Sequence, residues 1–440
     1  MTKNKEIEEQ QRKKIGEQLV KYREKKGLTQ VSAAAEIQIK NSLLSHYEQG
    51  RRKIKPEHLT KLASLYGINE KEFSDTTLTE KKTAYLREIL TLYKIKLAVI
   101  IGDINKDTII YADGKLGGDY DSDKDWKLGG GCFYAAKAAL RYGFLPVLFS
   151  TIGQEDGDAI LDELSKKTKE EGKCGVITTW IEKNPTLETS TCTITFGEGN
   201  NRKETGHQYN DHCNDFELSR LVEVISSSGA GKNDIIFCHG FRLNRKMREF
   251  NASKVIPKEK EDQRREYIQE FMESLSANGD DRPTIVFDLA PATDIYKNMT
   301  ISELRLVIEK SDVIVAELRT LLGFLFNDKP ENISDDVSKA INNDFEKFEK
   351  REITIINKKD YDTIIANFLG SRKGNTLILR YGVGNMDYEK IIERNEDGRP
   401  EVISDLSDKN NTTGYSDPQK KEKLGSGDMR TFEFLANKKK

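Results

Sequence analysis

The sequence predicts two domains of different class, a small all-α domain followed by a larger α/β domain, in a chain of 440 residues. Two observations carry this prediction. Over residues 15–73, apolar residues recur at helical spacing in short blocks that end in glycine. From residue 97 onward, short apolar runs alternate with amphipathic segments, as strands and helices do in α/β proteins.

Composition and charge narrow the class of protein. The chain is 36% hydrophobic and 33% charged, with a formal net charge of −2. This excludes the class of uniformly basic proteins that coat nucleic acid. The charge is uneven, because residues 1–75 carry 16 Lys and Arg against 11 Asp and Glu, whereas the remainder carries 55 against 62. We call residues 1–75 the head and the remainder the body. Because the head is mildly basic and the body acidic, only the head is expected to bind an anionic polymer.

Cysteine use and hydropathy predict a cytoplasmic protein that makes no membrane contact. Five cysteines without a CxxC pair exclude a full disulfide framework and favour free thiols in a reducing compartment. Residues 1–14 are polar and charged, unlike a signal peptide, and the longest apolar run, 97–102, is far shorter than the roughly 20 residues of a membrane span. We expect no metal site, because His207, His212 and Cys213 match no familiar ligand spacing.

The head is expected to contain four or five short helices after a charged arm at 1–14. Thr29 is a candidate N-cap, and the helix over 39–48 places Leu43, Leu44 and Tyr47 on one face. Its other face carries short polar side chains that can reach base edges in a major groove: Lys40, Asn41, Ser42, Ser45 and His46. Arg51 and Arg52 follow directly and offer positive charge to phosphates.

Residues 15–72 resemble the Cro/repressor-type (XRE) helix-turn-helix family. The match runs from LTQ at 28–30 through SHYEQGRRKIKPEHLTKLASLYGI at 45–68. The resemblance implies that Gln30 and residues 41–46 face double-stranded DNA, that the operator is palindromic and that the protein is a homodimer. Gln38 stands where the family usually turns on glycine. The alternative is a helical domain that has lost DNA binding and serves in dimerisation.

The body is expected to be a mostly parallel sheet with helices on both faces. A helix over 80–93 connects it to the head. The expected helices are 133–142, 158–172, 258–277 and 302–308, and the expected strands are 97–101, 146–150, 176–181, 190–196, 234–238, 284–287, 312–315, 353–356 and 376–379. Polar strands near 108–113 and 186–209 predict a small antiparallel flap, and the unpatterned residues 388–423 predict a long loop.

Three features of the body carry chemistry. Asp103, Asn105 and Asp107 follow a strand, where carboxylates can bind substrate hydroxyls. Gly129 and Gly130 precede a helix and allow the backbone to approach a ligand. The segment Gly425-Ser426-Gly427-Asp428 also precedes a helix, so its N–H groups can bind an anion while the aspartate acts as a general base.

In this order, the features of residues 95–436 resemble the ribokinase/PfkB carbohydrate kinase family. AALRYG at 138–143 and TIGQEDG at 151–157 match its first signature, Phe287-Asp288 its central strand end, and Gly425–Asp428 its GAGD box. The resemblance implies an αβα fold with a β-flap lid, ATP, Mg²⁺ and a sugar or nucleoside acceptor. It further implies roles for single residues: Asp428 as base, Gly425, Ser426 and Gly427 for the phosphoryl group, and Asp107, Gly129 and Gly130 for the acceptor.

Several departures from the kinase pattern bear on activity. Glu317 and Thr320 stand where the family has Asn-x-x-Glu, and Tyr134 stands where it has an asparagine. Lys423 and Leu424 replace two threonines, and only twelve residues follow Asp428. Asp428 could therefore be a simple helix cap.

Two functions follow from these patterns. The first is a transcriptional regulator with domains at 1–75 and 95–440, joined by a connector at 76–94, whose body binds a sugar, nucleoside or nucleotide. The second is an active ATP-dependent kinase with an autoregulatory DNA-binding head. The departures favour the first. A role in host defence or stress signalling, with a nucleotide as ligand, has no specific residue in its favour.

Overall fold

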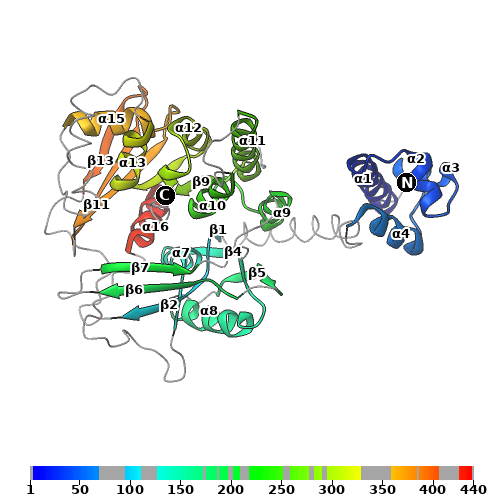
Figure 1. Cartoon of the computed structure of the whole chain (residues 1–440), viewed down its shortest axis with the longest axis horizontal. Helices are drawn as coiled ribbons and strands as arrows, with labels where there is room; N and C mark the ends of the chain where they lie inside the picture. Colours follow the sequence, from blue (N-terminus) through cyan, green and yellow to red (C-terminus); the bar gives the residue numbers. More distant parts are fainter. Residues whose placement is uncertain are drawn as a thin grey trace. The chain divides into compact units, whose positions relative to one another are not determined.

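The chain divides into two compact units, Met1–Ile89 and Leu90–Lys440 (Figure 1). A computed structural model describes residues 3–68, 95–110, 126–171, 175–185, 188–196, 202–208, 218–250, 258–276, 282–289, 295–328, 358–383, 386–405 and 426–438. The expected connector helix at 80–93 and the expected strand at 353–356 lie outside the described residues.

The head consists of four helices around its own core. They are α1 (Lys3–Lys25), α2 (Gln30–Glu36), α3 (Asn41–Glu48) and α4 (Pro56–Tyr66). Residues 3–14 of the expected arm form the first half of α1. Leu19, Leu44 and Leu62, one from each of three helices, are fully buried. Thr29 caps α2 as predicted, since the Ser32 N–H donates to its Oγ1 at 3.1 Å.

Each of the four helices of the head is followed by a turn residue in the left-handed backbone conformation. The turn residues are Gly27, Gln38, Gly50 and Gly67, with φ between 60° and 72°. At the end of α2, the Ile39 N–H donates to the Ala34 carbonyl at 2.9 Å and the Gln38 N–H to the Ala35 carbonyl at 3.0 Å. This is the bond pair of a Schellman motif, in which glycine is favoured because it has no Cβ. Gln38 is the one non-glycine residue with positive φ among the described residues.

We expect Gln38→Gly to raise the free energy of unfolding of the head by about 1 kcal/mol. The substitution removes the Cβ clash of the left-handed conformation, and part of that gain is offset because glycine is freer in the unfolded chain. Amide exchange in α2 and α3 of the full chain measures the effect. The matched control is Gln49→Gly, since Gln49 ends α3 with a φ of −84° and has no such strain to lose. Equal effects at both positions would contradict the prediction.

The body is built on a nine-stranded sheet of order β13-β12-β11-β10-β9-β8-β1-β4-β5. All pairs from β11 to β5 are parallel, which confirms a mostly parallel sheet. The strands are β1 (Lys96–Ile101), β4 (Phe144–Gly153), β5 (Ile177–Asn184), β8 (Ile235–His239), β9 (Thr284–Asp288), β10 (Val313–Glu317), β11 (Thr376–Val383), β12 (Met386–Arg394) and β13 (Pro400–Asp405).

The expectation of a long loop over 388–423 is wrong in its first half. β12 pairs antiparallel with β11, and β13 pairs antiparallel with β12. Ile391 and Ile392 of β12 are buried, whereas β13 is the edge strand and exposes Val402 and Ile403. A strand at the edge of a sheet buries little of its surface, so its sequence lacks the apolar run of a central strand. Residues 406–425 lie outside the described part.

A second sheet of four strands forms the predicted flap. Its order is β3-β2-β6-β7, with β2 (Asn105–Ile110), β3 (Lys127–Gly129), β6 (Thr191–Phe196) and β7 (Arg202–Gln208). β2 pairs antiparallel with β3 and β6 with β7, but β2 and β6 are parallel, so the expectation of an antiparallel flap is wrong for this central pair. β2 and β6 are separated by a long crossover that includes β4 and β5, and such a connection allows parallel pairing.

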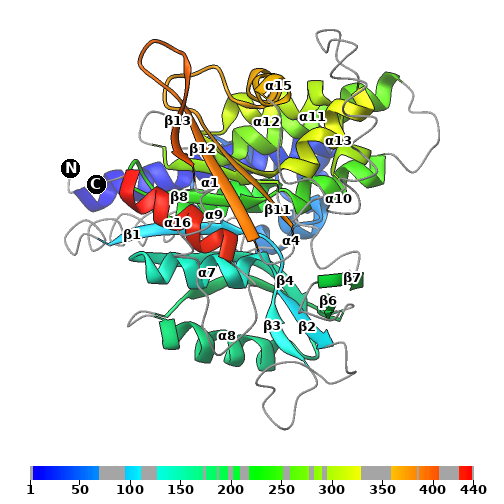
Figure 2. The same ribbon diagram turned by 90° about the vertical axis from the view of Figure 1, so that its left-hand side faces the viewer.

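Helices cover both faces of the main sheet (Figures 1 and 2). On one face Phe432 of α16 stacks on Phe237 of β8 with ring centroids 5.2 Å apart, and α16 contacts α7. On the other face Phe271 of α11 meets Phe287 of β9 edge to face. The helices are α7 (Gly131–Arg141), α8 (Gly157–Glu171), α9 (Leu218–Ser228), α10 (Phe241–Phe250), α11 (Lys258–Leu275), α12 (Ile301–Lys310), α13 (Leu318–Asp328), α15 (Lys358–Phe368) and α16 (Ser426–Lys438), with a 3₁₀ turn at Ile295–Lys297.

Within the described ranges, no helix has the length and apolar character that a membrane span requires.

Candidate functional site

The polar face predicted for the third helix of the head is exposed to solvent. Lys40, the N-cap of α3, and Asn41, Ser42 and His46 of α3 are exposed, and Ser45 is half-buried. Leu44 and Tyr47 of the same helix are buried against the core of the head. Arg51 and Arg52 are exposed in the turn after α3. The arrangement is that of an amphipathic helix whose polar first turns are accessible to the major groove of double-stranded DNA.

A buried carboxylate joins three helices of the head behind this face. Glu48 of α3 accepts from the Arg23 Nε at 2.7 Å and from the Arg23 Nη2 at 3.0 Å. Its Oε2 also accepts from the Gln30 Nε2 at 2.8 Å, and its side chain is 4% exposed. Gln30, predicted to face DNA, is therefore half-buried at the start of α2 with its amide N–H group engaged by Glu48.

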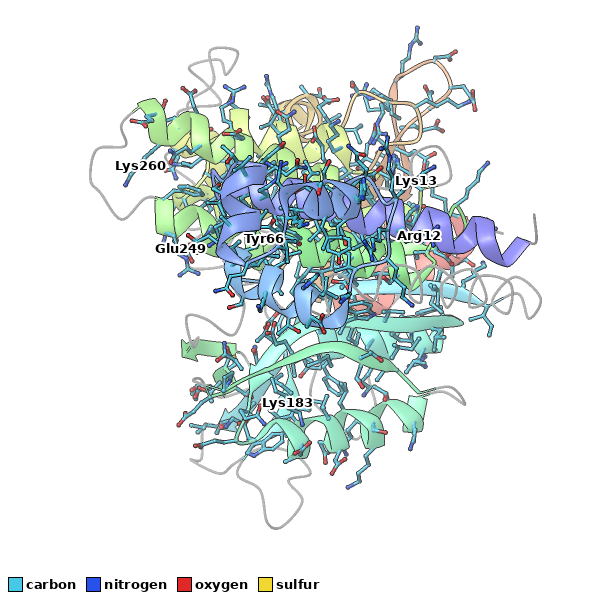
Figure 3. All side chains as sticks on the ribbon, turned by 90° about the vertical axis from the view of Figure 1, so that its right-hand side faces the viewer. Arg12, Lys13, Tyr66, Lys183, Glu249 and Lys260 are labelled. Carbon is cyan, nitrogen blue, oxygen red and sulfur yellow. The ribbon has the colours of Figure 1, made fainter. Side chains whose placement is uncertain are left out.

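The Glu48 carboxylate changes the pKa values of two side chains beside it, those of Arg23 and Tyr66. Figure 3 shows Tyr66 within the head. The hydrogen bond from Arg23 to Glu48 raises the pKa of the Arg23 guanidinium. Burial, and then the charge of Glu48, raise the pKa of the Tyr66 hydroxyl to about 12. Arg23 and Tyr66 therefore both stay protonated at neutral pH.

In the body, the ends of five parallel strands meet at one edge of the main sheet. The strand register pairs Ile101 with Cys238, His239 with Asp288, and Glu317 with Arg380. Asp103 follows the end of β1, and His239, Asp288 and Glu317 close β8, β9 and β10. Polar groups thus gather at the carboxyl edge of a parallel sheet, where α/β proteins bind ligands.

The five residues predicted to bind an acceptor come together next to this edge. Asp103, Asn105 and Asp107 are buried. A Cβ on Gly129 would overlap the Asp107 carboxylate, and a Cβ on Gly130 would lie 2.6 Å from the Asp103 carbonyl oxygen. The di-glycine therefore lies directly against the strand end and the start of β2, and no side chain larger than hydrogen fits there.

Asp103 has a structural task that the sequence did not reveal. Its Oδ1 accepts from the Gly131 N–H at 3.2 Å, at the first residue of α7, and its Oδ2 accepts from the Asn105 Nδ2 at 2.7 Å. Its backbone oxygen accepts from the Cys132 N–H at 2.9 Å. Asp103 therefore caps α7 from the connection between β1 and β2, and both of its carboxylate oxygens accept hydrogen bonds within the protein.

The N-terminus of α16 points toward the carboxyl edge of the sheet. Lys438, near the end of α16, donates to the Thr376 Oγ1 at 2.9 Å, where β11 begins. Thr431, one turn after the start of α16, accepts from Arg380, five residues into β11. α16 thus runs antiparallel to β11, with Ser426–Asp428 at the end nearest the strand termini. Gly425 and the side chains of Ser426 and Asp428 lie outside the described residues.

Arg380 is the centre of a buried charge cluster that the sequence analysis missed. Its Nη1 lies 3.7 Å from the Asp288 Oδ2, and its Nε donates to the Glu389 Oε2 at 3.5 Å. Asp288 and Glu389 are each 1% exposed. The one available signal was a charged residue at the end of the apolar strand TLILR. Arg380 balances two buried carboxylates and ties β9, β12 and α16 together.

Two more polar side chains are buried at this edge. His239 is 1% exposed, and neither ring nitrogen has a hydrogen-bond partner in the described part of the chain. Its ring fills the space beside Gly102 and Gly131. Thr320 stands where the kinase resemblance has glutamate, and its Oγ1 is likewise buried and unpaired among the described residues. Glu317, where that resemblance has asparagine, is half-buried at the end of β10.

Asp156 links the flap to the main sheet. Its Oδ2 lies 2.6 Å from the Lys106 Nζ of β2, and its Oδ1 accepts from the Thr189 Oγ1 at 2.6 Å. Thr189 in turn accepts from the Gly153 N–H at the end of β4, at 2.9 Å. Burial acts to raise the pKa of Asp156, but the hydrogen bonds from Lys106 and Thr189 outweigh it and lower the pKa overall.

We expect Asp156→Asn to loosen the flap and to remove one component of the acid sensitivity of the body. A carboxyl group whose pKa is lowered in the folded state stabilises that state above its unfolded pKa, and this stability is lost as the pH falls through the folded pKa. The free energies of unfolding of wild type and Asp156→Asn should therefore converge below about pH 4 and diverge toward pH 7. Urea titrations at both pH values, followed by tryptophan fluorescence, measure this; a difference that does not depend on pH would contradict it.

Groups of three or more metal-ligating side chains are absent from the described residues. Of the three residues weighed for a metal, His212 and Cys213 lie outside the described residues, as does the side chain of His207.

The head matches a known protein family, and the body is similar to several solved structures. Residues 19–73 match the helix-turn-helix family HTH_3, so this part of the chain is a helix-turn-helix domain. No curated protein matches the chain. Among solved structures, an uncharacterized sugar kinase from Pyrococcus horikoshii is 15% identical, with a TM-score of 0.41 over 70% of this chain and 76% of that one. It has also been crystallised with ATP.

Two further solved structures have the same kind of likeness. The ribokinase from Cryptococcus neoformans var. grubii serotype A, in complex with ADP, is 14% identical, with a TM-score of 0.43 over 78% of this chain and 87% of that one. The fructokinase from Vibrio cholerae O395 is 12% identical, with a TM-score of 0.44 over 78% of this chain and 89% of that one.

Proposed function

We propose that this protein is a DNA-binding transcriptional regulator whose α/β body binds a sugar, nucleoside or nucleotide. The observation that carries the proposal is the exposed polar face of α3 on a helix-turn-helix domain. Asn41, Ser42 and His46 offer hydrogen-bonding groups to base edges, and Arg51 and Arg52 offer charge to phosphates. We place the protein in the cytoplasm, where these partners are found.

The ligand-binding half of the proposal is supported by the carboxyl edge of the main sheet. Asn105 and Asp107 lie beside Gly129 and Gly130, and the N-terminus of α7 follows directly. Buried carboxylate and amide oxygens suit ligand hydroxyls. The first N–H groups of α7 already bind Asp103, so we expect the hydroxyl-bearing part of the metabolite to bind here.

A homodimer on a palindromic operator completes the proposal. Two recognition helices of this type meet successive half-sites when they lie roughly 34–36 Å apart. Ligand binding at the carboxyl edge would act on DNA affinity by changing that separation, with the flap as the closing element.

The direct test is binding of the full chain to the DNA upstream of its own gene, by fluorescence anisotropy at moderate salt. Asn41→Ala should weaken specific binding by about 1–3 kcal/mol, or roughly 5- to 150-fold, and leave binding to a random duplex unchanged. Gln49→Ala, at the exposed far end of α3, is the control. Absence of sequence-specific binding by wild type would overturn the proposal.

An active ATP-dependent sugar or nucleoside kinase is the second candidate. It is supported by the N-terminus of α16, which contains Asp428 in its first turn and points toward the strand ends. ATP and Mg²⁺ would be its cofactors, but the residues present fit them poorly. Thr320 and Glu317 replace the Asn-x-x-Glu pair, and Arg380 is already bound to Asp288 and Glu389. Equal background phosphoryl transfer by wild type and Asp428→Ala, over a broad panel of acceptors, would exclude it.

A further inference from the structure

The turn after α3 lies directly against the first half of α1. A Cβ on Gly50 would lie 2.5 Å from the backbone nitrogen of Lys13 and 2.8 Å from the carbonyl carbon of Arg12. Gly50 has a φ of +64° and is followed immediately by Arg51 and Arg52. Two segments that are far apart in sequence thus place four basic residues at one position on the head.

This juxtaposition is rigid, because α1 and the end of α3 make close backbone contact at two glycines. A Cβ on Gly16 would overlap the Glu48 carbonyl oxygen, one turn along α1 from the contact at Gly50. The bidentate pair between Arg23 and Glu48 joins the same two helices further along. The first half of α1 therefore moves together with the recognition helix.

The surface formed in this way is basic. Lys13, Arg51, Arg52 and Lys53 are exposed, and Arg12 is half-buried with an Nε that has no hydrogen-bond partner in the described part of the chain. Neither 12–14 nor 50–53 contains an acidic residue, and the acidic residues nearest to them in sequence are Glu9, Glu17 and Glu48. Lysine and arginine grouped without intervening acids attract an extended polyanion.

We propose that the DNA-contacting surface of the head extends beyond the helix-turn-helix segment onto α1, where Arg12 and Lys13 contact the same sugar-phosphate backbone as Arg51 and Arg52. This rests on the proposed DNA binding and adds a partner surface outside residues 19–73. The contacts are to phosphates, so they strengthen binding to every sequence alike and hold the register of α3 in the groove.

The test is the salt dependence of DNA binding by the full chain, measured by fluorescence anisotropy over a range of salt concentrations on the operator and on a random duplex. Each phosphate contact contributes about 0.9 to the slope of log K against log salt. Arg12→Gln with Lys13→Gln should lower that slope by about 2 on both duplexes. Lys21→Gln with Lys25→Gln, at exposed positions near the other end of α1, should leave it unchanged.

Two reference variants keep the result interpretable. Arg51→Gln with Arg52→Gln should lower the slope in the same way, and Arg12→Lys with Lys13→Arg, which keeps both charges, should retain the wild-type slope. If the charge-keeping variant also loses slope, the residues act through folding and the inference is overturned.

The remaining outcomes separate this inference from the proposed function. A wild-type slope for Arg12→Gln with Lys13→Gln, beside a reduced slope for the Arg51 and Arg52 variant, overturns the inference and leaves DNA binding intact. A change in sedimentation without a change in slope means that α1 contacts protein rather than DNA, which also overturns it. If wild type binds no duplex at any salt concentration, both proposals fall.

Discussion

Replacing Arg380 with methionine is expected to lower the free energy of unfolding of the body by about 3–5 kcal/mol. The substitution keeps most of the side-chain volume but removes the charge that balances Asp288 and Glu389. Both carboxylates are 1% exposed, so each would be left in a medium that disfavours its charge. Urea denaturation followed by the fluorescence of Trp126 and Trp180 measures the change, since both tryptophans lie in the body.

The control for this experiment is an arginine in a weaker ion pair. Arg372 lies 3.3 Å from Asp312, but its side chain is 44% exposed, so Arg372→Met should cost less than about 1 kcal/mol. Adding Glu389→Gln to Arg380→Met should recover part of the loss, because one stranded charge is removed. Equal losses for the two arginines, or no recovery in the double variant, would mean that Arg380 does not balance these carboxylates.

Gly16→Ala is expected to destabilise the head by about 3 kcal/mol, the upper part of the range for added atoms in a packed interior. The new methyl group would overlap the Glu48 carbonyl oxygen, and backbone atoms cannot rotate away as side chains do. Amide exchange in α1 and α3 of the full chain should accelerate about 100-fold, since each 1.4 kcal/mol corresponds to a factor of ten. DNA binding should weaken in parallel.

Gly27→Ala separates this steric effect from the general cost of replacing a glycine. Gly27 has a φ of +66°, and no atom of the described residues lies within 4 Å of the position that a Cβ would take there. Alanine at this position therefore meets backbone strain alone and should cost about 1 kcal/mol. A loss at Gly16 no larger than the loss at Gly27 would show that α1 and α3 are not held by backbone contact at Gly16.

Local chemistry was enough to predict most of the elements. The helices of the head followed from apolar spacing and from glycine at three of four helix ends, because both signals act over a few neighbouring residues. The buried strand 97–101 was predicted for the same reason and is observed as β1 (Lys96–Ile101). The prediction failed at β12, whose residues are mostly polar because the strand lies near the edge of the sheet.

The candidate sites were predicted only as separate pieces. The strand end at Asp103–Asp107 and the di-glycine at Gly129-Gly130 could be singled out, because turn residues and short polar side chains at strand ends are local features. The capping of α7 by Asp103 could not be predicted from local patterns. Asp103 and the Gly131 N–H are separated in sequence by a segment that includes two strands of the flap.

The sequence by itself therefore determined the two-domain division of the chain, the classes of the two folds and the polar face of α3. All of these depend on residue type and spacing along the chain. Only the tertiary structure decided that Arg380 pairs with Asp288 and Glu389, and that Arg12 and Lys13 lie against the turn at Gly50. Those contacts join distant segments, and their partners are selected by sheet order and helix packing, which a periodic pattern does not encode.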